Sequence, residues 1–109
     1  MIDKKKAALF ERQAEIAKAV AHPLRMAVLD FLRDGERCVC EIAEHVGSER
    51  SNVSRHLAVM VRAGVLGCRK DGLKVYYRLK TPCVAEFLSC ATRVLKRQAR
   101  ENEKLLACL

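Results

Sequence analysis

The stretch "CEIAEHVGSERSNVSRHLAVMVRAG", residues 40–64, decides the fold. Residues 40–46 place apolar side chains at a helical spacing, and "GSER" then interrupts that period. The period resumes after a polar start, with apolar side chains at Val53, Leu57, Met60 and Val61. A short helix, a glycine-containing turn and a second helix that is polar at its start form the pattern of a helix-turn-helix.

The next stretch, "VLGCRKDGLKVYYRL" at residues 65–79, has the pattern of a β-hairpin. Asp71 and Gly72 separate two runs of β-like composition, and an Asp-Gly turn of this kind needs positive φ at both residues. The hairpin is basic, with Arg69, Lys70, Lys74 and Arg78. A helix-turn-helix followed by a basic hairpin predicts a winged helix.

Helical periods also flank this unit. One covers residues 7–21, and another begins at Pro23 and ends at a capping glycine, Gly35. We expect Thr81 to cap a last helix whose first position is Pro82. A helix of this length seldom finds enough surface to pack against within a small domain. We therefore expect part of its apolar stripe to pack on a second chain.

The predicted fold class is therefore mainly α with a small β-hairpin wing. The order is four helices, two strands and a fifth helix, in one winged helix-turn-helix domain that spans residues 1–109 and dimerises through its first and last helices. Its parts are a helix-turn-helix at about 40–64, a wing at about 65–79 and a last helix at about 82–106.

Composition narrows the function. The net charge of +8 and the pI near 9.5 suit a polyanionic partner. No secretory signal and no apolar run of the ~20 residues that a membrane span needs are present, so a cytoplasmic protein is expected. Six cysteines there would stay reduced and serve metal binding, redox sensing or packing. The chain has neither a phosphate loop nor a nucleophile with a His partner, so we do not expect an enzyme.

The start of the second helix of the pair is the candidate base-reading surface, because side chains in the N-terminal half of such a helix reach base edges in the major groove. Those side chains are Ser51, Asn52, Ser54, Arg55 and His56. In the wing, Arg69, Lys70 and Lys74 would lie over the DNA backbone or the minor groove. Because strand side chains alternate, only some of them can face DNA. Glu49 would be repelled by phosphate if it faced the groove.

Cys38 and Cys40 stand where the first helix of the pair begins. Side chains at positions i and i+2 of a regular helix point to nearly opposite sides, so one ion on both sulfurs requires an unwound or extended helix start. Binding there would distort the helix that positions the recognition helix. Without an ion, the two cysteines would be small apolar fillers at the helix entry.

Over nearly its full length the chain resembles the ArsR/SmtB family of bacterial metalloregulatory repressors. Four segments carry the resemblance: "AHPLRMAVLDFL", "CVCEIAEHVG", "SNVSRHLAVMVRAGVL" and "RKDGLKVYYRL". The resemblance implies a homodimeric repressor that leaves an imperfect inverted-repeat operator when an ion or another thiol-reactive effector binds. It also implies that Cys-Val-Cys occupies the position of the family's arsenic, cadmium or lead site.

Two soft thiolates select soft ions, and arsenite or antimonite, As(III) or Sb(III), is the leading effector, as in arsenical resistance. Many arsenic-sensing members carry a third cysteine three residues after the second, where this chain has Ala43. The candidates for a third thiol are Cys68, Cys83, Cys90 and Cys108. Cys83 and Cys90 lie roughly 10 Å apart along one helix, too far to bind one ion together.

Other effectors, and one other class of protein, are alternatives to an arsenic-responsive repressor. The same scaffold would sense redox or reactive sulfur signals if the two cysteines joined covalently, or it would sense cadmium or lead. The family's zinc site on the last helix uses histidines, and no histidine follows His56. An effector-free winged-helix interaction module with merely buried thiols is the alternative from another class.

Overall fold

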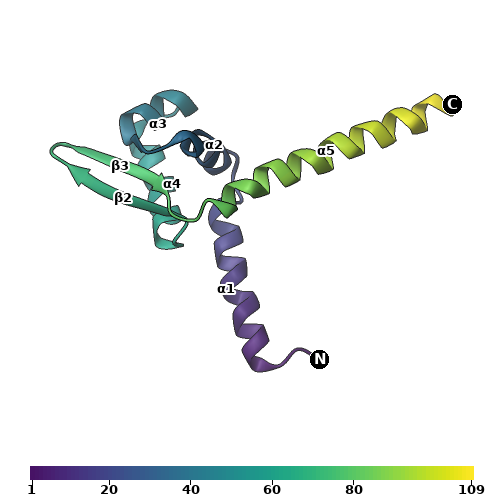
Figure 1. Ribbon diagram of the computed structural model, residues 1–109, viewed down its shortest axis with the longest axis horizontal. Coiled ribbons are helices and arrows are strands. Elements are labelled where there is room, and N and C mark those ends of the chain that lie inside the picture. The colour runs from purple at the N-terminus through teal and green to yellow at the C-terminus, as the bar shows by residue number, and fades with distance from the viewer.

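The computed structural model describes all 109 residues and has the predicted order of four helices, a hairpin and a fifth helix. Two long helices, α1 and α5, extend from a unit built of the remaining elements (Figure 1). The elements are α1 (Lys4–Val20), α2 (Pro23–Phe31), the 3₁₀ turn η1 (Leu32–Asp34), β1 (Arg37–Cys38), α3 (Val39–Val46), α4 (Arg50–Arg62), β2 (Leu66–Asp71), β3 (Lys74–Leu79) and α5 (Cys83–Ala107). The predicted fold class is confirmed.

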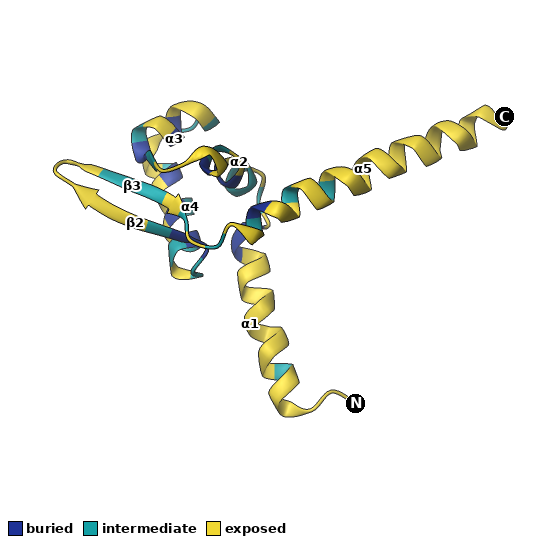
Figure 2. Cartoon of the chain, viewed as in Figure 1, coloured by how far each residue is buried: buried dark blue, intermediate teal, exposed yellow.

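The core lies where α2, α3 and α4 meet the base of the hairpin (Figure 2). Of the inward side chains predicted for α4, Val53, Leu57 and Met60 are buried there and Val61 is partly buried against the cluster. No polar or charged residue is buried. Twelve buried residues form one cluster: Val20, Val28, Leu29, Leu32, Val39, Ile42, Ala43, Val53, Leu57, Met60, Val65 and Leu66. The position of α4 is thus set by apolar packing against α2 and α3.

The hairpin belongs to a three-stranded antiparallel sheet in the order β1-β3-β2. The two-residue strand β1 was not predicted, because a run so short carries no β period of its own. It pairs with β3 so that Cys38 lies opposite Tyr76, and β2 pairs with β3 so that Cys68 lies opposite Tyr77. Side chains directly opposite each other share a face, so this register decides which side chains of the wing meet.

Two local expectations were wrong. The turn residues are Gly72 and Leu73, and only Gly72 has positive φ, 63°, the requirement at the first central position of a type II′ turn. Thr81 does not cap α5: its hydroxyl donates to the Gly64 carbonyl at 3.4 Å, and Pro82 is the N-cap residue. The hydroxyl thus links the start of α5 to the turn after α4.

The two long helices are mostly exposed (Figure 2). Only the last turn of α1, at Ala19 and Val20, and Ala85 in α5 are buried. The Cα radius of gyration is 17.5 Å, against about 13 Å for a compact domain of this length. No helix is both long enough and apolar enough to cross a bilayer.

Candidate nucleic-acid interface and thiol pair

The start of α4 carries the polar side chains that we expected to read bases. Ser51, Ser54 and Arg55 are exposed, whereas Val53, Leu57 and Met60 of the same helix are buried. Asn52 is half-buried: its Nδ2 donates to Ser48 Oγ at 2.9 Å, and its Oδ1 accepts from Arg55 at 3.4 Å. The fold therefore leaves Ser51, Ser54 and Arg55 open to an external partner.

His56 has a partner inside the protein. Its Nδ1 accepts a hydrogen bond from Arg25 Nε at 3.0 Å, and its ring centroid lies 4.5 Å from that of His22. Burial lowers the pKa of His56, and the charges of His22, Arg25 and Arg55 lower it further. This placement argues against a base contact through Nδ1, so His56 is better described as a link between α4 and the start of α2.

The basic side chains of the wing are not equivalent. Arg69 of β2 is bound by Glu36: Arg69 Nη2 lies 2.6 Å from Glu36 Oε1, and Arg69 Nε lies 2.9 Å from Glu36 Oε2. Its guanidinium also lies 4.7 Å from the centroid of the Tyr76 ring. Lys70 and Lys74 are exposed and make no ion pair. Arg69 is therefore engaged within the chain, and its expected contact with DNA stays a prediction.

Strand register separates the basic side chains further. Lys74 lies opposite Asp71 and shares a face with Arg69, whereas Lys70 lies opposite Val75 on the other face. Arg78 lies opposite Gly67, and a Cβ at Gly67 would come within 2.7 Å of the Arg78 guanidinium carbon. Glycine at this position therefore lets the Arg78 side chain lie across β2.

The two cysteines at the start of α3 are already in contact. Their sulfur atoms are 2.7 Å apart. The sulfurs meet because the helix start is extended, the condition expected for one ion on both: α3 begins at Val39 and Cys38 is its N-cap residue, with extended φ −80° and ψ 160°. Cys38 stands outside the helix, so its side chain meets that of Cys40 without any unwinding.

The two thiols differ in acidity and exposure. Cys38 is 2% exposed and Cys40 is half-buried. The hydrogen bond between them raises the pKa of Cys38, which burial raises further, and the same bond lowers the pKa of Cys40, with a smaller contribution from the charge of Lys74. Cys40 is therefore the thiol that more readily forms the thiolate, the reactive and metal-binding form.

Glu41 completes the helix start. The Cys38 backbone N–H donates to Glu41 Oε1 at 3.3 Å, and the Cys38 sulfur faces the Glu41 backbone N–H in return, the arrangement of a capping box. The bond from the Cys38 backbone lowers the pKa of Glu41, and the nearby Arg37 lowers it further. The Cys38 sulfur thus serves both the thiol pair and the cap of α3.

No third thiol of the same chain joins the pair. Cys68 is excluded by register, because it shares a face with Tyr77 whereas Cys38 shares the opposite face with Tyr76. Cys83, Cys90 and Cys108 are exposed, on α5 or just after it. Nowhere in the chain do three or more His, Cys, Asp or Glu side chains gather in an arrangement that could hold a metal ion. Within one chain, the site offers two sulfurs.

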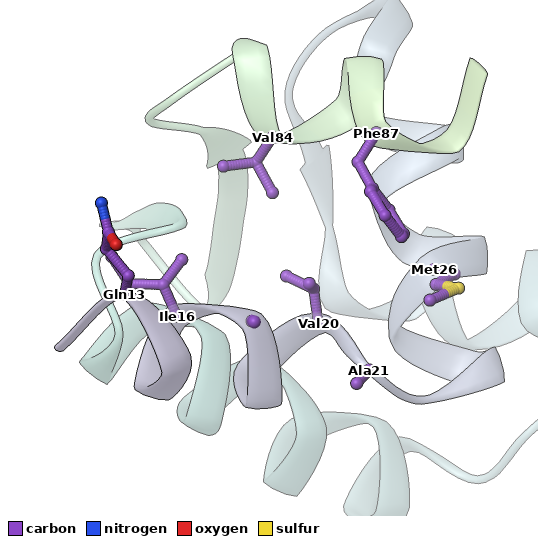
Figure 3. A pocket seen from close by; sticks show the side chains of 8 residues that line it. Gln13, Ile16, Val20, Ala21, Met26, Val84 and Phe87 are labelled. Atoms are coloured by element: carbon purple, nitrogen blue, oxygen red, sulfur yellow. The ribbon is translucent and has the colours of Figure 1, made fainter. Parts of the chain in front are cut away.

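A cavity of about 370 Å³ lies between α1, α2 and α5. Side chains from all three helices point toward it, and it is almost entirely apolar (Figure 3). Its lining includes Ile16, Val20, Met26, Val84 and Phe87. It continues the exposed apolar stripe of α5, where Phe87, Val94 and Leu95 are each more than half exposed.

Comparison with known proteins gives one family. The model for bacterial regulatory proteins of the arsR family matches residues 22–66. An HTH-type transcriptional regulator of Mycobacterium tuberculosis is 41% identical over 99 residues, which are 90% of this chain and 87% of the relative. A probable mercury resistance operon repressor of Streptomyces lividans is 37% identical over 95 residues, which are 87% of this chain and 73% of that protein.

Comparison with solved structures gives the same fold. The solution structure of a homodimeric winged helix-turn-helix DNA-binding domain from Mycobacterium bovis, a possible ArsR-family regulator, matches with a TM-score of 0.78 and 30% identity over 92% of this chain and 93% of that chain. The crystal structure of a Mycobacterium tuberculosis protein matches with a TM-score of 0.74 and 39% identity over 86% of this chain and 95% of that chain.

Proposed function

Because the chain belongs to the arsR family of bacterial regulatory proteins, we propose that it is a homodimeric transcriptional repressor that leaves its operator when a thiophilic effector joins Cys38 and Cys40. The observation that carries this proposal is the 2.7 Å contact between the two sulfurs at the N-cap of α3. An effector that binds there acts on the helix that packs against α4.

The DNA-binding surface is the exposed start of α4 together with the wing. Ser51, Ser54 and Arg55 enter the major groove, Asn52 follows once Ser48 releases its amide, and Lys70 or Lys74 contacts the backbone. The net charge of +8 supports a polyanionic partner. A dimer presents two α4 helices about one helical turn of DNA apart, so the operator is an imperfect inverted repeat.

A second copy of the chain covers the apolar faces of α1 and α5. Phe87 and Leu95 are 51% and 64% exposed, and a monomer would leave these side chains in water beside the cavity at the base of the two helices. The similar Mycobacterium bovis domain is homodimeric. Dimerisation through the first and last helices would bury this surface.

The leading effector is trivalent arsenic or antimony bound by two thiolates. In this reaction arsenous acid, As(OH)₃, condenses with the thiols of Cys40 and Cys38. Two As–S bonds form, two As–O bonds break, and each hydroxide leaves with a thiol proton as water, so one hydroxide stays on arsenic. The half-buried Cys40 reacts first because its pKa is lowered. Cadmium or lead on the same pair is the variant in which a divalent ion replaces two thiol protons.

Release follows from loss of the cap. A Cys38 sulfur bonded to arsenic moves toward the ion and away from the Glu41 N–H that it now faces. The Glu41 N–H is one of the helix-start donors that have no partner within the helix, so without the sulfur the start of α3 would fray or shift. Ile42 and Ala43 of α3 lie in the same buried cluster as Val53 and Leu57 of α4. A shift of α3 therefore repositions the recognition helix.

A redox sensor is the second candidate, and the unequal acidity of two sulfurs in contact favours it. The Cys40 thiolate would attack a peroxide oxygen, giving a sulfenic acid and an alcohol or water. The Cys38 thiol would then displace water from that sulfur to form a disulfide. The two thiols together lose two electrons to the peroxide.

Operator binding measured by fluorescence anisotropy at fixed salt separates these candidates. Arsenite, antimonite, cadmium and lead are titrated under excess non-chelating phosphine reductant, and hydrogen peroxide is titrated without it. We expect arsenite to release the parent and the matched control Cys68→Ser, but neither Cys38→Ser nor Cys40→Ser. Release of both Cys38→Ser and Cys40→Ser at the parent's arsenite concentration would show that the pair is not the site.

A further inference from the structure

Arg69 and Glu36 form the most fully connected ion pair of the chain. Both nitrogens on one edge of the guanidinium are engaged, at 2.6 and 2.9 Å from the two carboxylate oxygens. Tyr76 lies under the guanidinium, and Asp71 stands 3.6 Å from the third nitrogen. These contacts hold the Arg69 side chain in one orientation, although it remains about half exposed.

The shape of the contact matters for DNA binding. A guanidinium fork matches the two oxygens of a carboxylate and two oxygens of a phosphate in the same way. While Glu36 fills the fork, the same edge of Arg69 cannot bind a phosphate. Lys70 and Lys74 make no ion pair, so only Arg69 among the basic side chains expected to contact DNA is blocked by a carboxylate.

We propose that Glu36 is an intramolecular competitor for DNA phosphate at Arg69, so that the wing binds the backbone fully only after this ion pair opens. The inference rests on the proposed function, because it requires the wing to lie on DNA. It adds a specific autoinhibitory contact that sets how tightly the free repressor engages its operator.

The position of Glu36 links this contact to the thiol pair. Glu36 precedes β1, whose second residue is Cys38. Tyr76 on β3 lies directly opposite Cys38 on one side and Arg69 on the other, so all three share one face of the sheet. A displacement of Cys38 therefore moves the segment that holds Glu36 against Arg69.

The solvent exposure of the Glu36–Arg69 ion pair limits how much its loss can change operator affinity. Exposed ion pairs contribute little free energy. The two hydrogen bonds of the Glu36–Arg69 pair and its place over the Tyr76 ring put it toward the upper end of the range for exposed pairs. Removal of the competitor should therefore tighten operator binding about two- to fivefold.

A double-mutant cycle on the intact dimer tests the inference. Operator affinity is measured at several salt concentrations for the parent, Glu36→Gln, Arg69→Gln and the double variant. We expect Glu36→Gln to bind about two- to fivefold more tightly, with a steeper salt dependence, and Arg69→Gln to bind more weakly. In the Arg69→Gln background, Glu36→Gln should have no effect. Thermal melting confirms that each variant is folded.

Glu44→Gln is the matched control, because Glu44 is exposed on α3 and makes no ion pair. Its effect on operator affinity should be the same in the parent and in the Arg69→Gln background. If Glu36→Gln also tightens binding equally in both backgrounds, the gain is a general charge effect and the competitor role is wrong.

Lys70→Gln and Lys74→Gln show whether the wing reaches DNA at all. If either lysine variant weakens binding while the Glu36–Arg69 coupling is zero, the wing contacts DNA and only the competitor role fails. If no wing variant changes affinity, the placement of the wing in the proposed function fails, and the competitor role fails with it.

Discussion

The unit from α2 to β3 and the two long helices, α1 and α5, differ in how far their apolar side chains are buried. Apolar side chains of the first, such as Leu29, Ile42 and Leu57, are fully buried within one chain. Apolar side chains of the second, such as Phe10, Phe87 and Leu95, are about half exposed or more. The difference teaches that a single chain buries the core that positions α4, while the long helices leave apolar surface uncovered, which is the surface that we propose a second chain covers.

Truncation of the core should have the largest effect on stability. Leu57→Ala removes a fully buried side chain between α4 and the rest of the cluster, and such cavities cost about 2–5 kcal/mol. Urea denaturation measures the loss. Leu73→Ala is the matched control, because Leu73 is fully exposed at the tip of the hairpin and should change the unfolding free energy by less than about 0.5 kcal/mol. Equal losses for the two variants would contradict the division between core and surface.

A charge on the apolar stripe of α5 should act on association. Leu95→Glu would place a carboxylate in the expected dimer interface and weaken the dimer by about 2–4 kcal/mol, because two-fold symmetry doubles each change. Sedimentation equilibrium measures the dissociation constant.

Thr92→Glu makes the same change of charge on the polar side of α5, near Ser89 and Lys96, and should leave the dimer intact. A Leu95→Glu dimer as tight as the parent would mean that this stripe is not the interface.

Thiol labelling compares cysteines of the two regions. We expect Cys38 to react with iodoacetamide more slowly than any other thiol, by about tenfold or more, because it is buried and its pKa is raised by the bond to Cys40. Mass spectrometry after timed labelling gives the rate for each site. Cys40→Ala removes that bond and should bring the labelling rate of Cys38 closer to the rates of the other thiols. A Cys38 that reacts as fast as Cys83 in the parent would contradict the described geometry.

The pH dependence of stability should show the smallest effect. Burial lowers the folded-state pKa of His56 below its usual 6.5, so the unfolded chain binds the proton more readily. The contribution of His56 to the free energy of unfolding is therefore fully present above pH 6.5, and it falls as the pH drops toward the folded-state pKa. The effect is small because the imidazole is only half-buried. Urea midpoints at several pH values should vary less in His56→Gln than in the parent, and equal pH dependence in both would rule out this role.

Much of the candidate site followed from the sequence. The base-reading surface was expected at Ser51, Asn52, Ser54, Arg55 and His56. Ser51, Ser54 and Arg55 are exposed, whereas Asn52 and His56 are half-buried and hydrogen-bonded within the chain. The thiol pair was singled out from its spacing, and an extended helix start was named as the condition for one ion on both sulfurs; the structure places Cys38 in extended conformation at the N-cap, so the sulfurs already meet. Helix ends depend on caps as well as on periodicity, so they are the least secure part of such an inference.

By itself, the sequence determined the order of the helices, the wing and the buried faces of α2, α3 and α4, because the 3.6-residue period and turn residues act within a few positions of the chain. Only the tertiary structure decided that β1 pairs with β3, that Glu36 binds Arg69 across 33 positions and that Arg25 binds His56 across 31. It also placed Cys68 on the opposite face of the sheet from Cys38. Such contacts depend on strand register and helix packing, which long-range burial sets and no local pattern encodes.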